Sequence, residues 1–247
     1  MKKIILFIVE GRNDEREIKA TLRRSKYFER YRSSYEICFA VIGTDITQSG
    51  LFSKGKKKVE NIRLKIDGIV LKFRRGEFGA PYNNIAASEI QEVVQIVDLD
   101  GVFIDRHDRI IEGTNSHIKY EDDCIITNDV DWIRRRNRIK GENLQKLIQA
   151  KTAGGIPYSI YYVSCNMDHV LFNNRNAVQF EKDAAAERVV TLGDAIDAFL
   201  EESLFSEGIM TDSNYQQSWE EIQLDTNSLN RHTNFNLFFD ERAKNPK

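Results

Sequence analysis

The segment that most limits how this chain can fold is an unbroken apolar run, Ile4 to Val9, that ends at Glu10 and Gly11. A strand with one face in water would alternate apolar and polar side chains. A continuous run of this length instead predicts a strand that is buried on both faces of a parallel sheet.

A helix is expected directly after this strand, extending to about Arg24. Asn13 or Asp14 can cap its first turn, and Ile18 and Leu22 lie four residues apart, on one inner face. Strand, turn and helix together make half of a βαβ unit.

Three further segments have the composition of strands, at residues 35–42, 92–97 and 158–163. Strands that alternate with helical stretches predict an α/β fold with a mostly parallel central sheet flanked by helices. In such folds the functional groups lie at the carboxyl ends of the strands.

The chain divides into a catalytic part, residues 1–190, and an extension, residues 191–247, that is acidic and rich in Asn and Gln. Thr191 and Asp194 resemble a capping box, which predicts a helix to about Leu204. Its inward-facing residues are expected to be Ala195, Phe199 and Leu204. Beyond it, the tail is expected either to pack as irregular structure or to dock on a partner, and its widely spaced aromatic residues are Trp219, Phe235, Phe238 and Phe239.

Acidic side chains stand where the predicted strands end. Glu10 follows the first strand, Asp98 and Asp100 follow the third, and Asp168 follows the fourth. Carboxylates from neighbouring parallel strands can share one hard divalent cation, because Mg²⁺ prefers oxygen ligands and retains positions for water and phosphate. Alternation along the strand sends the side chain of Leu99 into the core between the two aspartates.

These residues also carry a resemblance to a known family. The sequence from Ile4 through Glu10-Gly11 to Glu15 resembles the first motif of the Toprim domain, and Val97-Asp98-Leu99-Asp100-Gly101 resembles its DxD motif. That domain occurs in type IA topoisomerases, bacterial primases and nucleases of the overcoming-lysogenisation-defect group. The similarity covers roughly residues 2–175 and is greatest to small Toprim proteins of bacterial antiviral defence.

The resemblance implies a nuclease that depends on Mg²⁺ or Mn²⁺. Glu10, Asp98 and Asp100 match the family's catalytic and metal-binding acids, and Asp168 matches an acid that defence relatives keep as a further metal ligand. The chain has no acid at the second residue after Asp100 and is too short for strand gates, which argues against a topoisomerase. The absence of a zinc module argues against a primase.

Basic residues cluster in two places that suit a nucleic-acid backbone, which Lys and Arg bind without reading bases. One is an insertion at residues 53–77, for which a solvated hairpin is an equally good interpretation. The other follows Trp132, where the bases would surround a helix and mostly face water. The candidate contacts are Lys54, Lys56, Lys57, Lys58, Arg74, Arg75, Arg135 and Lys140.

Two other functions remain open. Asp98-Leu99-Asp100-Gly101-Val102 also resembles the nucleophile motif of haloacid-dehalogenase phosphatases, and Asp194 with Asp197 loosely matches their fourth motif. That interpretation leaves Glu10 without a role. The chain could also be an inactive module that only binds a partner.

Composition narrows the setting of the protein. The 247 residues carry a formal net charge of −2 and three cysteines without close pairing, so reduced, buried thiols are expected. No apolar run is long enough to cross a membrane, which favours a cytoplasmic location. The chain has no phosphate-binding loop of its own, so a regulatory ATPase in trans is an expected partner beside nucleic acid, and a homodimer would be unsurprising.

Overall fold

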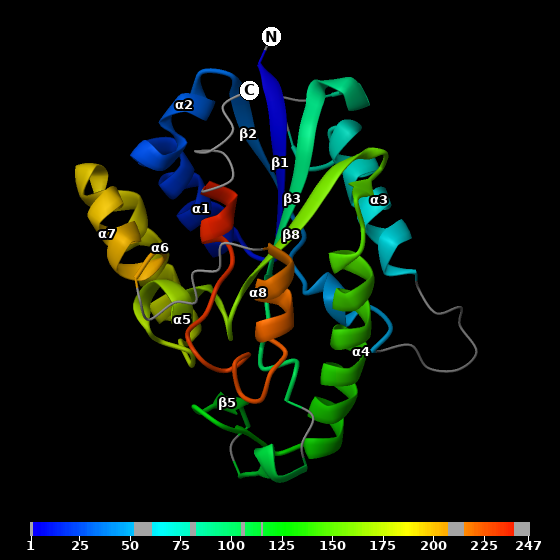
Figure 1. The fold of residues 1–247 in the computed structure, drawn as a ribbon, viewed down its shortest axis with the longest axis vertical. Helices are drawn as coiled ribbons and strands as arrows, with labels where there is room; N and C mark the ends of the chain where they lie inside the picture. Colours follow the sequence, from blue (N-terminus) through cyan, green and yellow to red (C-terminus); the bar gives the residue numbers. More distant parts are fainter. Residues whose placement is uncertain are drawn as a thin grey trace.

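The computed structural model describes residues 2–51, 61–79, 83–104, 107–114, 116–206 and 215–239. Its centre is a five-stranded sheet with helices on both faces (Figure 1). The strands, in spatial order, are β2 (Tyr35–Val41), β1 (Lys3–Val9), β3 (Ile90–Asp98), β8 (Ile156–Val163) and β7 (Thr152–Ala153). The first four are parallel, and only β7 runs antiparallel to its neighbour. The predicted α/β class and mostly parallel sheet are confirmed.

Two groups of helices cover the sheet. One face packs against α1 (Arg12–Arg24), α5 (Met167–Phe172), α6 (Gln179–Thr191) and α7 (Ile196–Ser203), with the short α2 (Glu29–Arg32) following α1. The other face packs against α3 (Ile62–Arg74), α4 (Val130–Ile148) and α8 (Tyr215–Glu221).

The apolar run of β1 supplies both cores, as its lack of alternation predicts. Successive side chains of a strand point to opposite faces. One set therefore packs under α3 and α4, and the other packs under α1. The two sets are Ile4, Leu6 and Ile8, and Ile5, Phe7 and Val9.

A second, smaller sheet lies beyond the carboxyl end of the main sheet, near the β5 label in Figure 1. It consists of β4 (Ile110–Glu112), β6 (Ile125–Thr127) and β5 (Lys119–Tyr120). Ile110, Ile125 and Ile133 form its core together with Leu229 from the C-terminal segment.

The C-terminal segment 215–239 packs into the body of the molecule, largely as irregular structure. Thr233 forms a bridge with Val163 at the end of β8. Four aromatic side chains of this segment are buried, and they are Trp219, Phe235, Phe238 and Phe239. Of the two expectations for this tail, packing as irregular structure is observed for residues 222–235, whereas α8 is a regular helix.

The expected capping box at Thr191 is wrong. Thr191 is the last residue of α6, and its hydroxyl donates to the carbonyls of Glu187 and Arg188 within that helix. The next helix, α7, begins at Ile196 after one turn of 3₁₀ helix. Ile196 and Leu200 point into the core, whereas Ala195 is exposed.

Two expectations from composition are met within the described residues. The three cysteines, Cys38, Cys124 and Cys165, are buried and unbridged. None of the described helices has the length and apolar character needed to cross a membrane.

Candidate functional site

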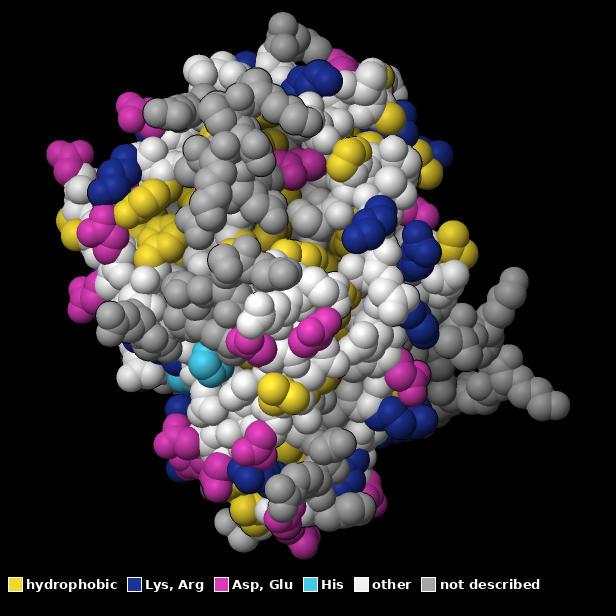
Figure 2. Space-filling model, viewed as in Figure 1, with side chains coloured by type: hydrophobic (Ala, Val, Ile, Leu, Met, Phe, Trp, Pro, Cys, Tyr) yellow, Lys and Arg dark blue, Asp and Glu magenta, His cyan; other side chains and the backbone are white. Residues whose placement is uncertain are grey.

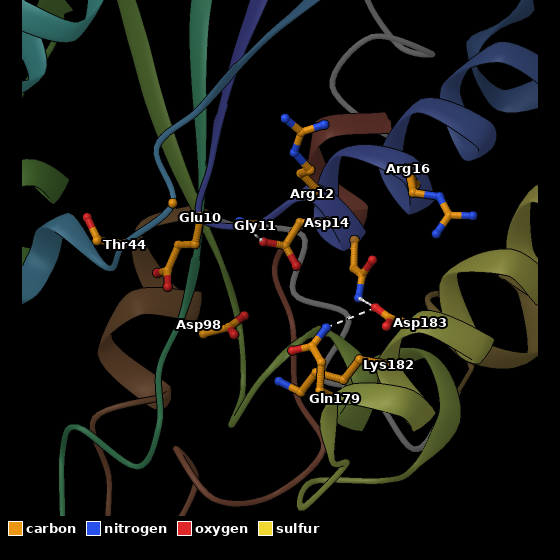
Figure 3. Close-up of a pocket in the computed structure, with 12 residues that line it drawn as sticks. Glu10, Gly11, Arg12, Asp14, Arg16, Thr44, Asp98, Gln179, Lys182 and Asp183 are labelled. Carbon is orange, nitrogen blue, oxygen red and sulfur yellow. Dashed lines mark hydrogen bonds between the residues drawn. The ribbon is translucent and has the colours of Figure 1, made fainter.

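The register of the sheet brings two of the predicted acids to one edge. Ile8 of β1 pairs with Gln95 of β3, so Glu10, two residues further on, lies beside the end of β3 at Asp98. Both carboxylates line a cavity of about 570 Å³. Figure 3 shows them on neighbouring strand ends, with Asp14 from α1 nearby and Lys182 from α6 across the cavity.

Glu10 has an unused, enclosed oxygen. Its Oε1 is shielded from solvent and has no hydrogen-bond partner. Burial, reinforced by the carboxylates of Asp45 and Asp98, raises the pKa of Glu10 well above its ordinary value. A buried acceptor without a partner is costly, so this oxygen is suited to a cation or a proton donor that binds from the cavity.

The first turn of α1 is capped differently from the sequence expectation. Gly11 is the N-cap residue, and Asp14, at the third helical position, accepts a hydrogen bond from the Gly11 amide at 2.7 Å. This interaction turns the chain sharply after Glu10 and brings Asp14 to the cavity wall.

The Asp98–Gly101 segment departs from the strand as predicted. Leu99 is fully buried, and the Asp100 amide donates to the carbonyl of Cys165 at 2.9 Å. Asp100 has a φ of +52° and Gly101 a φ of +65°, so two successive residues adopt left-handed backbone. A Cβ on Gly101 would lie 2.6 Å from the Leu229 side chain, which explains why glycine is needed there.

The pKa of Asp98 is also raised well above its ordinary value. Burial is the main cause, and the carboxylates of Asp14 and Asp100 add to it. Two acids that resist ionisation at neighbouring strand ends are typical of a functional site rather than of a structural ion pair.

The carboxylate of Asp100 is bound by a lysine. Lys140 of α4 donates from Nζ to Asp100 Oδ2 at 2.8 Å and to Asp45 Oδ2 at 2.7 Å. The side chain of Lys140 is 0% exposed, so it lies inside the site and not on a surface that a nucleic-acid backbone would touch. Burial alone would lower the pKa of Lys140, but Asp100, Asp45 and Glu10 outweigh it and raise the pKa.

Sequence reasoning missed Asp45, although one signal for it existed. It follows the predicted strand 35–42 by three residues, beyond the Gly43 that closes it, and therefore stands at the carboxyl end of a strand like the other acids. Lys140 outweighs the effect of burial and lowers the pKa of Asp45. The lowered pKa favours the ionised form of Asp45.

Asp168 belongs to a second group of acids, with Asp14 and Glu17, and not to the first group, which is Glu10, Asp98 and Asp100. It lies 3.7 Å from Lys182, and its charge acts on Asp14 and Glu17. Glu17 is 2% exposed, its Oε1 has no hydrogen-bond partner, and burial followed by the repulsion of Asp168 and Asp14 raises its pKa to about 9. The charges of Asp98 and Asp100 also act on Lys182, so this lysine lies between the acids of the first group and those around Asp168.

The residues predicted to contact nucleic acid differ in their exposure and in their partners. Arg135 and Arg75 are exposed, whereas Arg74 donates from Nε to the Ile85 carbonyl at 2.9 Å. In Figure 2, Lys and Arg gather along the side that carries α3 and α4, and Asp and Glu are frequent on the opposite side, at α7. Four candidates, Lys54, Lys56, Lys57 and Lys58, lie outside the described residues.

The acidic side chains of the site have the ligand chemistry that a divalent metal ion requires. Glu10, Asp98 and Asp100 offer only carboxylate oxygens, which Mg²⁺ and Mn²⁺ prefer, and Glu10 Oε1 is enclosed and unpaired. Within the described ranges no three His, Cys, Asp or Glu side chains already converge as a ligand group.

Comparison with known proteins adds no relative. No family model, curated protein or solved structure matches this chain.

Proposed function

We propose that this protein is a metal-dependent nuclease that hydrolyses phosphodiester bonds in nucleic acid, with Glu10, Asp98 and Asp100 as its metal-binding acids. The observation that carries the proposal is the unpartnered, enclosed Oε1 of Glu10 beside Asp98 at the carboxyl edge of a parallel sheet. A bound cation would stabilise the ionised form of both carboxylates, which burial disfavours.

The chemistry proposed is hydrolysis. A bound Mg²⁺ or Mn²⁺ would neutralise the charge that develops on the phosphate oxygens. A water oxygen forms a bond to phosphorus, the bond between phosphorus and the leaving oxygen breaks, and that oxygen takes up a proton. Glu10 either holds the cation or accepts the proton of the attacking water.

The rim of the cavity suits a phosphate backbone. Arg12 and Arg16 from α1 and Lys182 from α6 line the same space as the acids. Cations at the rim attract the substrate, and the acidic floor keeps the phosphate away from the interior unless a metal ion is present. The resemblance to defence-type Toprim proteins extends the proposal to a bacterial antiviral effector that works beside a regulatory ATPase in the cytoplasm.

The phosphatase alternative gains nothing from the structure. Asp197, which would belong to its fourth motif, accepts a hydrogen bond from the Lys26 amide at 3.0 Å on an exposed surface of α7. Asp98 instead shares its surroundings with Glu10, Asp14 and Asp100, so the interpretation that uses Glu10 is the one we propose.

The test is cleavage of plasmid DNA and of total cellular RNA with Mg²⁺ or Mn²⁺, with and without any ATPase encoded beside the protein. Glu10→Gln and Asp98→Asn should each abolish cleavage, whereas Glu36→Gln, which changes an exposed acid of β2, should leave it unchanged. Cleavage that survives both site substitutions would overturn the assignment. Release of phosphate from small esters that depends on Asp98 alone would support the phosphatase instead.

A further inference from the structure

α4 presents a row of buried polar side chains to the site. Arg136, Lys140 and Asn143 are spaced by four and three residues, and so they lie on one side of the helix, next to Asn137. An inward face of this composition is unusual, since buried polar groups are costly unless each is hydrogen-bonded. Its partners therefore indicate what the face is for.

One part of this face holds the turn that carries Asp100. Arg136 donates from Nη2 to the Asp100 carbonyl at 2.6 Å and from Nη1 to the Tyr120 hydroxyl at 3.1 Å. Asn137 donates to the Gly101 carbonyl at 3.1 Å. The backbone of the left-handed turn is thus fixed to α4 independently of the Asp100 carboxylate.

The other part holds the loop that carries Asp45. Asn143 donates to the carbonyls of Thr47 and Ser49 at 2.8 and 3.0 Å. Asp45 accepts from the Thr47 amide at 2.8 Å and from Gln48 Nε2 at 2.9 Å, in addition to Lys140. Both oxygens of Asp45 are occupied, which makes it a fixed anchor.

Asp100 is held less completely. Its Oδ2 accepts from Lys140 at 2.8 Å, whereas Oδ1 accepts only a long hydrogen bond from the Tyr120 hydroxyl at 3.4 Å. Its side chain is 21% exposed, compared with 10% for Asp45. The ammonium of Lys140 therefore connects a carboxylate with two well hydrogen-bonded oxygens to a carboxylate whose second oxygen is only weakly bound.

We propose that Asp45 and Lys140 are a positioning pair, in which Asp45 fixes the Lys140 ammonium and the ammonium presents Asp100 to the metal ion through its remaining oxygen. Neither residue touches the metal ion or the substrate in this account. The inference rests on the proposed metal site, and it adds a residue, Asp45, that no motif in the sequence indicates.

The pair has a distinct consequence when its two members are changed separately and together. In Asp45→Asn the anchor loses its charge, and Lys140 is left to Asp100 alone, which should weaken metal binding by roughly 10- to 100-fold, as changes behind metal ligands do. The charge of the site also changes in that variant, and a general electrostatic effect would act in the same direction. The double variant Asp45→Asn/Lys140→Met removes one negative and one positive charge, so it restores the net charge without restoring the position of Asp100.

The experiment is a calorimetric titration of the metal-free full-length protein with Mn²⁺ alone, with thermal unfolding of each variant to show that it is folded. We expect wild type and Glu36→Gln to bind equally, and both Asp45→Asn and the double variant to bind at least tenfold more weakly. Wild-type affinity in the double variant, or in Asp45→Asn, would overturn the positioning role while leaving the metal site intact. A wild-type protein that binds no Mn²⁺ would overturn the metal site itself, and the inference with it.

Discussion

At the scale of single residues, the most informative positions are those that break a local rule. Glu17 is an acid buried without a partner for Oε1, Gly101 stands where a side chain would collide with its neighbours, and Glu10 keeps an unused oxygen next to a cavity. Glu10 and Asp98 could be predicted because they end apolar strands. Glu17 could not, since an acid on a helix is ordinarily solvated, whereas Asp45 was missed although it follows the end of a predicted strand.

Glu17 should make the stability of the metal-free protein depend on pH. Its pKa rises from 4.5 to about 9 on folding, so its neutral form favours the folded state at low pH, and this contribution is lost as pH rises from about 4.5 through about 9. Glu17→Gln remains neutral and should be more stable than wild type at pH 8, with the difference shrinking toward pH 5. Thermal unfolding in EDTA measures this. A variant less stable than wild type at pH 8 would mean that Glu17 is ionised and paired.

Gly101→Ala should destabilise the fold by about 3 kcal/mol, because left-handed backbone and a collision with Leu229 and Ile125 act together. Gly155→Ala is the matched control. Gly155 has a φ of +78° but open space around it, so the substitution should cost only about 1 kcal/mol. Urea denaturation gives both values, and equal costs would show that the space around Gly101 adjusts.

At the scale of elements, the four long strands were predictable, whereas several helices were not, including α3, which occupies much of the segment for which a solvated hairpin was an equally good interpretation. Strand-forming composition and the residues that close each run locate these strands, so β1, β2, β3 and β8 lie within two residues of their expected ends. α6 buries only Ala186 and Val189, and its weak pattern gave no sign of a helix that ends at Thr191. The capping box was therefore assigned to the wrong side of Thr191. The charge pattern also gave an incomplete interpretation of α4, because the sequence does not show which basic side chains of a helix face inward.

The polar face of α4 should contribute to stability through its hydrogen bonds. Asn143→Ala leaves the Thr47 and Ser49 carbonyls without their donor and should cost about 2 kcal/mol. Glu142→Ala changes the exposed neighbour on the same helix and should cost less than about 0.5 kcal/mol. Urea denaturation of both variants measures these two costs. Equal stability of the two variants would contradict a structural role for this face.

At the scale of the whole molecule, the C-terminal segment completes the cores that the sheet begins. Phe235 and Phe238 pack on Phe7 of β1, and Trp219 packs on Tyr162 of β8 with ring centroids 4.9 Å apart. Widely spaced aromatic residues among Asn and Gln have no periodicity, so the sequence offered two outcomes for this tail. Their contacts with β1 and β8 are long-range and become visible only in the folded chain.

Phe238→Ala should therefore destabilise the whole molecule by about 3–5 kcal/mol, as loss of a buried aromatic ring does. Phe180→Ala is the matched control, since that ring is 73% exposed on α6 and its loss should change stability by less than about 0.5 kcal/mol. Thermal and urea unfolding should show a single transition in each case. A small effect of Phe238→Ala would mean that the tail is dispensable for the core.

The central claim is that Glu10 and Asp98, together with Asp100, bind a divalent cation at the carboxyl edge of the sheet. The most direct test is a crystal structure of the protein with Mn²⁺, with anomalous scattering used to locate the ion. The account predicts a peak within ligand distance of carboxylate oxygens of Glu10 and Asp98, with Asp100 as the third carboxylate and still held by Lys140. An empty cavity at saturating Mn²⁺, or a peak on other residues only, would contradict it.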